Sequence, residues 1–146
     1  MNSGSTTQII GAIVDVEFSS SLPPLNTALI VEGITLEVAS HLGRNIVRCI
    51  ALGPTDGLSR GLSVTDTGSP VSVPVGKGVL GRMFNVVGEP IDGKSFPKDG
   101  PRLPIHRASP SLTNQGVKIE IFETGMKVID LMAPFIKGGK TAVFGG

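Results

Sequence analysis

The residues with the clearest chemical meaning stand at the end of the sequence, where the short apolar segment Thr141–Phe144 runs into Gly145 and Gly146. A buried strand that ends in glycines is how a phosphate-binding loop begins, because its bare backbone N–H groups can close around phosphate oxygens. The complete motif is G-x-x-x-x-G-K-[ST], in which the lysine reaches the terminal phosphates and the hydroxyl residue binds Mg²⁺. The two glycines therefore predict the opening of a nucleotide site, and their alternative interpretation is a plain flexible terminus.

Four further charged or titratable residues have a spacing that favours structural roles. Lys137 and Lys140 flank a Gly-Gly turn, and this position favours solvated charges over direct contact with phosphate. His41 and His106 have no partners at metal-ligand spacing, so both are predicted to lie at the surface or at the edge of the core. We therefore predict no metal site and assign none of these residues to catalysis.

The carboxylates of Glu89 and Asp92 could in principle form a catalytic pair. Pro90 and Gly93 stand beside them, however, and this composition indicates a turn. Arg82 is predicted to anchor the segment that links two domains rather than to touch a substrate. The sequence thus predicts no catalytic residue in this stretch.

The composition argues against binding to nucleic acid. The chain has 13 basic and 12 acidic residues, a net charge of +1, no Trp or Tyr and only six Phe. A basic patch for phosphates and aromatic platforms for bases are both missing, which disfavours a nucleic-acid-binding barrel. The single Cys49 stands in an apolar run and is predicted to be a small core residue in a reducing compartment rather than a reactive thiol.

The sequence predicts no membrane-spanning helix and no targeting segment. No apolar run approaches the roughly 18–20 residues that cross a bilayer. The first residues lack the pattern of a signal peptide and the Arg-rich pattern of a transit peptide. We therefore expect any link to a membrane to be made through partners.

The first part of the chain has the pattern of short strands. Ala12, Val14, Val16 and Phe18 alternate with acidic residues, as expected of a strand with one buried face. Two further strands are predicted near residues 28–31 and 34–38. Glu32-Gly33 between them is a plausible tight hairpin turn, since glycine supplies a positive φ.

Later strands complete a predicted small barrel. The apolar run around Cys49 is one strand, and short strands near residues 62–64 and 71–73 end at Pro70 and Pro74, which suit sheet edges. This gives about five or six strands at a spacing of about a dozen residues, which is typical of a closed antiparallel barrel. Closure would remove the exposed edges that strands this short otherwise present.

The pattern changes near residue 80, where we place a domain boundary between residues 1–80 and 81–146. A strand is predicted over residues 117–123, followed by a helix over residues 125–133 that Thr124 caps and Pro134 ends. Thr141–Phe144 is predicted to be a buried strand. With few neighbours to cover it, residues 81–146 are expected to be loosely ordered while the barrel holds together.

Three stretches in series resemble the beta (catalytic) subunits of F-type ATP synthases. They read IIGAIVDVEF over residues 9–18, VGKGVLGRMFNVVGEPID over residues 75–92, and ETGMKVIDLMAPFIKGGKTAVFGG over residues 123–146. LPIHRA over residues 103–108 agrees as well. The last stretch is similar to the family's approach to its phosphate-binding loop, which continues with A-G-V-G-K-T. The resemblance covers essentially the whole chain in order, with departures at residues 141–143 and a short segment at 93–101.

This resemblance implies an all-β N-terminal barrel of about six short antiparallel strands, followed by the truncated start of an α/β P-loop nucleotide-binding domain. In the family the barrel joins those of neighbouring alpha and beta subunits in a crown. Gly145 and Gly146 would open the loop that binds ATP or ADP with Mg²⁺ in the full subunit. The catalytic groups of the family would lie beyond residue 146, so the chain alone is expected neither to bind nor to hydrolyse ATP.

The resemblance also implies partners and a location. The expected partners are alpha subunits, which alternate with beta subunits in a hexamer, and the gamma subunit of the central stalk. The subunit would be held peripherally on an energy-transducing membrane through the Fo sector. The cytoplasmic side of a bacterial plasma membrane is favoured over plastid or mitochondrial membranes.

Two alternatives remain open at this point. Noncatalytic alpha subunits, flagellar export ATPases and the Rho helicase share parts of the pattern but favour G-Q-R before the strand, whereas this chain has Lys137-Gly138-Gly139-Lys140. The barrel could also be an assembly module without nucleotide chemistry of its own. The sequence downstream of a phosphate-binding loop would separate the enzyme from the assembly module.

Overall fold

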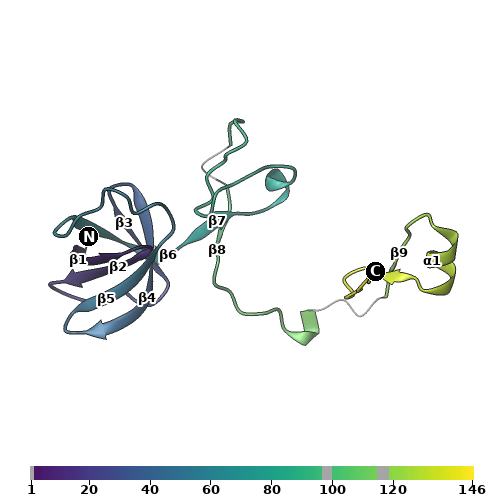
Figure 1. Cartoon of the computed structure of the whole chain (residues 1–146), viewed down its shortest axis with the longest axis horizontal. Coiled ribbons are helices and arrows are strands. Elements are labelled where there is room, and N and C mark those ends of the chain that lie inside the picture. Colours follow the sequence, from purple (N-terminus) through teal and green to yellow (C-terminus); the bar gives the residue numbers. More distant parts are fainter. Residues whose placement is uncertain (1, 97–99, 115–118) are drawn as a thin grey trace. The chain divides into compact units, whose positions relative to one another are not determined.

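The computed structural model describes residues 2–96, 100–114 and 119–146, which fall into two compact units (Figure 1). The first unit is Met1–Arg107 and the second is Ala108–Gly146. Residues 71–107 thus pack in the same unit as the barrel. The predicted domain boundary near residue 80 stays a prediction.

Six strands of the first unit form a closed barrel in which every pairing is antiparallel (Figure 1). The order around the barrel is β1-β2-β5-β4-β3-β6, and it closes because β1 pairs with both β2 and β6. The predicted all-β barrel of about six strands is confirmed. The strands are β1 Ser3–Ile10, β2 Ile13–Phe18, β3 Thr27–Val31, β4 Ile34–Gly43, β5 Ile46–Ala51 and β6 Ser63–Pro70.

The barrel interior is filled by small and branched apolar side chains. Val14, Val16 and Phe18 point inward, as their alternation predicts. The prediction for Ala12 is wrong, because the chain turns at residues 11–12 and leaves Ala12 exposed between β1 and β2. The buried cluster consists of Val14, Val16, Phe18, Leu29, Val31, Leu36, Val38, Val47, Cys49, Ala51 and Val64.

The hairpin between β3 and β4 has the two-residue turn predicted at Glu32-Gly33. Val31 pairs with Ile34, and the two turn residues have φ of 47° and 79°. Positive φ at both positions is the requirement of a type I′ turn, whose twist matches that of the flanking strands. Glycine meets this requirement freely, whereas glutamate adopts the left-handed region at a cost.

The rest of the first unit is a small lobe built on a short ladder. β7 Ser72–Pro74 pairs with β8 Arg102–Pro104, and a single 3-10 turn, η1 Lys77–Val79, follows β7. Pro70 ends β6 and Pro74 ends β7, so both prolines lie at strand ends, as predicted. A single bridge between Phe84 and Pro90 closes the loop that separates the two strands.

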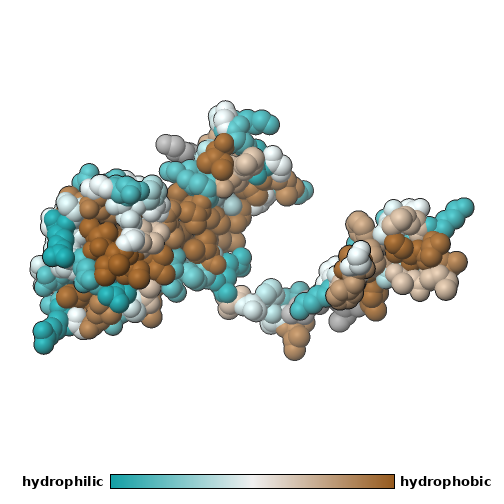
Figure 2. Space-filling model, viewed as in Figure 1, coloured by the Kyte–Doolittle hydropathy of each residue, from teal (hydrophilic) through white to brown (hydrophobic). Residues whose placement is uncertain are grey.

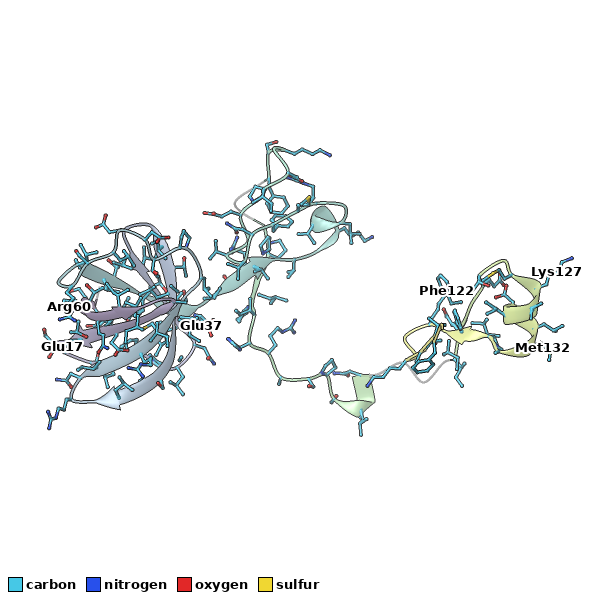
Figure 3. All side chains as sticks on the ribbon, in the orientation of Figure 1. Glu17, Glu37, Arg60, Phe122, Lys127 and Met132 are labelled. Carbon is cyan, nitrogen blue, oxygen red and sulfur yellow. The ribbon has the colours of Figure 1, made fainter. Side chains whose placement is uncertain are left out.

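The described residues of the second unit form a two-stranded sheet, a 3-10 turn and a short α-helix (Figure 3). Its elements are η2 Leu112–Asn114, β9 Ile121–Phe122, α1 Lys127–Met132 and β10 Phe135–Ile136. The strand predicted over residues 117–123 is reduced to β9, and residues 117–118 of that prediction lie outside the described residues. The predicted helix is confirmed but is three residues shorter, because Gly125 with φ of 82° turns the chain before it.

The start of this helix is organised by Asp130 rather than by the predicted cap Thr124. The cap position is Met126, which makes no side-chain cap bond. Asp130 Oδ1 accepts hydrogen bonds from the Thr124 hydroxyl at 2.7 Å and from its N–H at 3.0 Å, and Oδ2 accepts one from the N–H of Gly125 at 3.0 Å. These donors, the Thr124 hydroxyl first, lower the pKa of Asp130. Thr124 Oγ1 still accepts a hydrogen bond from the N–H of Met126 at 3.2 Å, so Thr124 supports the turn from two residues before the cap position.

The strand predicted at Thr141–Phe144 is wrong for this structure. These residues have no regular structure, and Val143 and Phe144 are 84% and 96% exposed. A buried parallel-type strand exists only where neighbouring strands bond it on both sides. In the described part of the second unit the pairing strands are β9 and β10, which bond each other.

Within the described ranges, no helix is long and apolar enough to cross a membrane.

The turn at Glu32 offers a direct test of the hairpin. We expect Glu32→Asn to stabilise the chain by about 0.5–1 kcal/mol, because asparagine tolerates the left-handed region. We expect Gly33→Ala to destabilise it by about 1 kcal/mol, through backbone strain alone, since an added Cβ at Gly33 meets nothing within 4 Å. Urea unfolding followed by far-ultraviolet circular dichroism measures both changes.

Glu17→Asn is the matched control, since Glu17 is an exposed glutamate within β2 on extended backbone. It should show no gain in stability. A Glu32→Asn variant no more stable than the parent chain would contradict the type I′ assignment.

Candidate functional site

The predicted nucleotide-binding residues lie in the irregular end of the second unit. Gly145 and Gly146 are exposed, and a Cβ added at either meets nothing within 4 Å. Both residues are therefore open to solvent. That they contact phosphate stays a prediction, because the described residues around them form no enclosed cradle.

The lysines near this end behave as surface charges. Lys137 Nζ lies 3.4 Å from Glu120 Oε2, and both side chains are more than half exposed. The Lys137 N–H donates to the Glu120 carbonyl at 2.8 Å, next to the β9–β10 pairs. Lys140 is exposed as well. This placement agrees with the predicted solvated charges.

The two histidines contact structural partners. His41 Nε2 lies 2.8 Å from the carbonyl of Pro23, and His106 Nε2 lies 2.8 Å from Glu37 Oε1. In the described part of the chain no group of three or more His, Cys, Asp and Glu side chains is arranged to hold a metal ion.

Cys49 is a core residue, as predicted. Its side chain is fully buried inside the barrel. Burial, with a smaller contribution from the charge of Asp15, raises the pKa of its thiol to about 12. A thiol of this kind stays protonated at neutral pH and is a poor nucleophile.

Arg82 ties the loop of the lobe together, and its role as the anchor of a segment that links two domains stays a prediction. Its guanidinium donates two hydrogen bonds to the Asp92 carboxylate, one from Nε and one from Nη2. It also donates to the carbonyls of Lys94 at 2.9 Å and Ser95 at 3.2 Å. The side chains of Arg82 and Asp92 are 15% and 11% exposed. The predicted turn around Glu89 and Asp92 is therefore a loop closed by an ion pair.

Two aromatic rings cover this ion pair. The Arg82 guanidinium carbon lies 5.9 Å from the ring centre of Phe84 and 5.3 Å from that of Phe96. The two rings meet edge to face at 5.0 Å. The hydrogen bond from Arg82 is the main reason that the pKa of Asp92 lies well below its usual range, so Asp92 is ionised wherever the lobe is folded near neutral pH.

A second arginine joins this loop to the β7–β8 ladder. Arg102 Nη2 donates to the carbonyls of Ser72 at 2.7 Å and Val87 at 3.0 Å. Gly88 packs directly beneath it, and a Cβ added there would lie 2.5 Å from Pro74 Cδ. Only glycine fits this approach, which also uses a φ of 77°.

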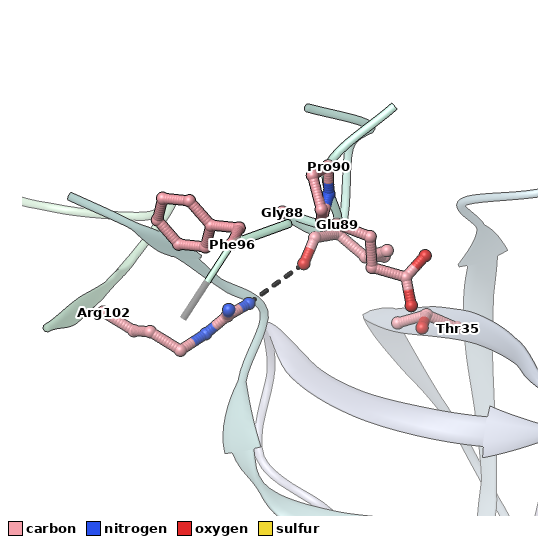
Figure 4. A pocket seen from close by; sticks show the side chains of 7 residues that line it. Thr35, Gly88, Glu89, Pro90, Phe96 and Arg102 are labelled. Atoms are coloured by element: carbon pink, nitrogen blue, oxygen red, sulfur yellow. Dashed lines mark hydrogen bonds between the residues drawn. The ribbon is translucent and has the colours of Figure 1, made fainter. Parts of the chain in front are cut away.

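A cavity of about 390 Å³ lies beside Arg102 in the first unit (Figure 4). The Phe96 ring, the Arg102 guanidinium and the Glu89 side chain surround it, together with Thr35, Val87, Gly88 and Pro90. Its charged groups already have partners, since Arg102 donates to the two carbonyls and Glu89 accepts from Asn85 at 2.8 Å. Both side chains are therefore held in place by neutral partners.

An ion pair on the outer wall of the barrel shields Asp15, which the alternation of β2 did not reveal. Asp15 faces outward, but it is only 4% exposed, because Arg48 on β5 covers it. Arg48 Nε and Nη2 each donate to one carboxylate oxygen at 2.8 Å. This bond to Asp15 raises the pKa of Arg48. The Asp15 carboxylate, which the alternation predicts to be exposed, is thus joined by two hydrogen bonds to the neighbouring strand β5.

Three isoleucines form an exposed apolar row beside this ion pair. Ile10 pairs with Ile13 across β1 and β2, and Ile13 pairs with Ile50 across β2 and β5. They are 58%, 40% and 48% exposed. Neighbours at cross-strand positions stand about 5 Å apart, so the three side chains form one continuous surface, which we call the isoleucine row. The sequence already indicated that Ile13 is exposed, because Ile13 lies on the same outward side of β2 as the acidic residues Asp15 and Glu17.

One further exposed isoleucine stands apart from the row. Ile30 on β3 is 43% exposed and pairs with Thr35 and Thr65 on its two neighbouring strands. An isolated apolar residue of this kind is ordinary on a protein surface. Ile30 therefore serves as a reference for the isoleucine row.

A comparison with known protein families identifies the barrel. Residues 6–68 match the model of the ATP synthase alpha/beta family, beta-barrel domain. The match begins within β1 and ends within β6, so it covers the closed barrel and stops before the lobe.

The arginine at position 82 can be tested by substitution. Lysine keeps the charge but lacks the planar fork that reaches Asp92 and two carbonyls at once. We expect Arg82→Lys and Asp92→Asn to speed hydrogen exchange of the Ile91 amide, which bonds the Met83 carbonyl, by about tenfold or more. Exchange followed by nuclear magnetic resonance at pH 6.5 measures the change.

The same ion pair predicts an acid dependence. Because the pKa of Asp92 is lowered in the fold, its contribution is present above the ordinary carboxyl pKa of about 4 and is lost as pH falls below it. The Asp92→Asn variant should lose this dependence. Arg60→Lys, at an exposed position (Figure 3), is the control. Unchanged Ile91 exchange in both variants would contradict the anchoring role.

Proposed function

We propose that this chain, whose residues 6–68 match the model of the ATP synthase alpha/beta family, beta-barrel domain, is the N-terminal part of the catalytic beta subunit of a rotary ATP synthase. The observation that carries the proposal is the closed six-stranded barrel over the residues matched by the family model. The stretches over residues 75–92 and 123–146, which follow the barrel and resemble beta subunits, favour the beta subunit over the alpha subunit. The complete subunit would make ATP from ADP and phosphate, driven by a transmembrane ion gradient.

The turn before the terminal residues supports the beta type over the alpha type. Gly138 has φ of 77°, and the Gly139 N–H donates to the Ile136 carbonyl at 3.0 Å. A Cβ at position 139 would lie 3.0 Å from that same oxygen, so a side chain there requires the turn to shift by a few tenths of an ångström. The Gly-Gly pair of the beta type fits this turn, whereas the glutamine of the G-Q-R pattern would crowd it.

Gly145 and Gly146 are proposed to open the loop that holds ATP or ADP with Mg²⁺. Their part would be to present unobstructed N–H groups to phosphate oxygens. The phosphates and Mg²⁺ would supply the reacting group and its charge neutralisation. In the motif G-x-x-x-x-G-K-[ST], Gly145 would be the first residue and Gly146 the second.

The barrel is proposed to assemble beside other barrels of the family, through alternating alpha and beta subunits. A closed barrel has no free strand edge, so contact with a neighbour must use side chains of its wall. The isoleucine row is the apolar surface that fits this role on the described wall. The same row supports the second candidate function, an assembly module without nucleotide chemistry of its own. The gamma subunit and peripheral attachment to an energy-transducing membrane follow from the first candidate.

Nucleotide binding distinguishes the two candidate functions in the parent protein. We expect the 146-residue chain to show no binding of Mg-ATP by calorimetry, because the lysine and hydroxyl residue of the motif are needed to hold the phosphates. A parent gene that continues with A-G-V-G-K-T, and a parent protein that binds Mg-ATP, would support the catalytic subunit. A continuation unable to wrap a triphosphate would refute it and leave the assembly module.

Assembly through the isoleucine row is tested by charge substitution. We expect Ile13→Lys and Ile50→Lys to weaken association with an alpha-type subunit by at least about tenfold, because each buries a charge in an apolar contact. Sedimentation velocity of the mixed proteins measures association. Ile30→Lys is the matched control, with similar exposure outside the row. Equal association of all three variants, each folded by circular dichroism, would exclude the row as the contact.

A further inference from the structure

Two Asp-Gly pairs of the first unit hold their carboxylates in opposite settings. An aspartate before a glycine is prone to internal rearrangement, because glycine has no Cβ to keep its own backbone nitrogen away from the aspartate side chain. The two pairs are Asp56-Gly57 and Asp92-Gly93, and a third, Asp99-Gly100, begins outside the described residues. The chain therefore contains a matched comparison in which the dipeptide is the same and the surroundings differ.

The Asp92 carboxylate is held on both of its oxygens. Arg82 donates to it from Nε and from Nη2, and the Lys94 N–H donates to Oδ1 at 3.1 Å. The Asp92 side chain is also shielded, with 11% of it exposed. The hydrogen bond from Arg82 first of all lowers the pKa of Asp92, so this group stays an ionised carboxylate, whose carbon is a poor target for a nucleophile. These hydrogen bonds must break before the carboxyl group can turn towards the Gly93 nitrogen.

Asp56 lies in an exposed turn between β5 and β6. Asp56 and Gly57 are both exposed, and Gly57 has φ of 89°. The hydrogen bond that closes the turn runs from the Leu58 N–H to the Thr55 carbonyl at 3.1 Å, so it uses neither the Asp56 carboxylate nor the Gly57 nitrogen. In the part of the chain that the structure describes, the ion pairs involve the carboxylates of Asp15, Glu37, Asp92 and Glu120. The Asp56 side chain can therefore turn towards the Gly57 nitrogen without first leaving one of these ion pairs.

We propose that Asp56 is a site of spontaneous isoaspartate formation in the barrel, and that Arg82 protects Asp92 from the same reaction. The Gly57 nitrogen attacks Cγ of Asp56, the carboxyl OH and the amide hydrogen leave as water, and a cyclic succinimide closes. Water then adds to the former main-chain carbonyl carbon, and the bond from this carbon to the Gly57 nitrogen breaks. The main chain now runs through Cβ and Cγ, and the former carbonyl carbon bears the free carboxylate. The two steps release and consume one water and need no other reactant, and the inference does not depend on the proposed function.

The rearrangement changes a connection that is fixed to the barrel on both sides of position 56. Thr55 Oγ1 donates to the carbonyl of Gly11, between β1 and β2, at 2.8 Å. Leu58 packs against the buried cluster, and the Ser59 carbonyl accepts a hydrogen bond from Thr6 Oγ1 at 2.8 Å. An isoaspartate adds one carbon to the main chain between these contacts, so they cannot all keep their geometry. The reaction therefore loosens the connection between β5 and β6.

Peptide mapping of the full chain tests this proposal. Trypsin cuts after Lys and Arg, so it places the two aspartates in separate peptides, residues 49–60 and 83–94, the first of which ends at the exposed Arg60 (Figure 3). After incubation of the folded chain at neutral pH, isoaspartate in each peptide is measured by enzymatic methylation of its new carboxylate with labelled S-adenosylmethionine. We expect isoaspartate to form at least about tenfold faster at Asp56 than at Asp92, because the reaction at Asp92 must first break charge-assisted hydrogen bonds.

The same chain in urea is the matched control, because unfolding removes the contacts of both aspartates and should make their rates similar. In the folded chain, Arg82→Lys should speed the reaction at Asp92 and leave Asp56 unchanged, since lysine lacks the fork that holds both oxygens. Asp56→Glu should abolish the signal in residues 49–60, because the longer side chain cannot close the same ring. Equal rates at the two aspartates in the folded parent chain would overturn the proposal, and so would a signal at Asp56 that appears in urea alone. An unchanged rate at Asp92 in a folded Arg82→Lys variant would refute the protecting role of Arg82.

Discussion

Closure of the barrel at β1 is the constraint on which the rest of the first unit depends. β1 bonds β2 along most of its length and β6 through Ser3, Gly4 and Ser5. Gly4 sits at this junction, opposite Phe18 on one side and Val64 on the other. A Cβ there would lie 2.7 Å from the Glu17 carbonyl and 2.8 Å from a methyl of Val16. The sheet can close only because one residue of β1 has no side chain.

Closure decides how the barrel can act. Because the strands are joined in a ring, the backbone N–H and C=O groups of the wall are hydrogen-bonded within the barrel. Recognition of another protein by the wall therefore depends on the side chains of its outer face. That face is divided between a polar part, where Arg48 covers Asp15, and the apolar isoleucine row. The division suits a surface that meets another protein, because the apolar row can be buried while the neighbouring charges are already paired with each other.

The sequence predicted the parts of the fold that local periodicity encodes. Alternation located the inward faces of Val14, Val16 and Phe18, and glycine at position 33 located a hairpin. It did not predict that β1 begins at Ser3, because its first residues are small and polar and show no apolar alternation. It also did not predict that Asp15 is covered, because the arginine responsible is 33 residues away in sequence. Cross-strand register, which no local pattern contains, decides such contacts.

The candidate site divides in the same way. The burial of Cys49 followed from its neighbours in sequence, whereas the isoleucine row needed the register of three strands. The strand at Thr141–Phe144 was predicted from its apolar residues, but apolar character alone forms no strand without neighbours to bond it. The assignment of Gly145 and Gly146 to a nucleotide site depends on the resemblance to a known family. It is therefore a proposal, and the geometry around these residues does not support it independently.

The second unit shows what local interactions achieve without a large core. Its helix has six residues, far fewer than the roughly 12–15 that an isolated helix needs to be stable in water. Val128, Leu131 and Met132 on this helix are 74–82% exposed, and Figure 2 shows hydrophobic residues gathered on the surface of this unit. Burial of apolar surface therefore contributes little to the helix. What fixes its start is the Asp130 carboxylate, which accepts three hydrogen bonds from the preceding turn.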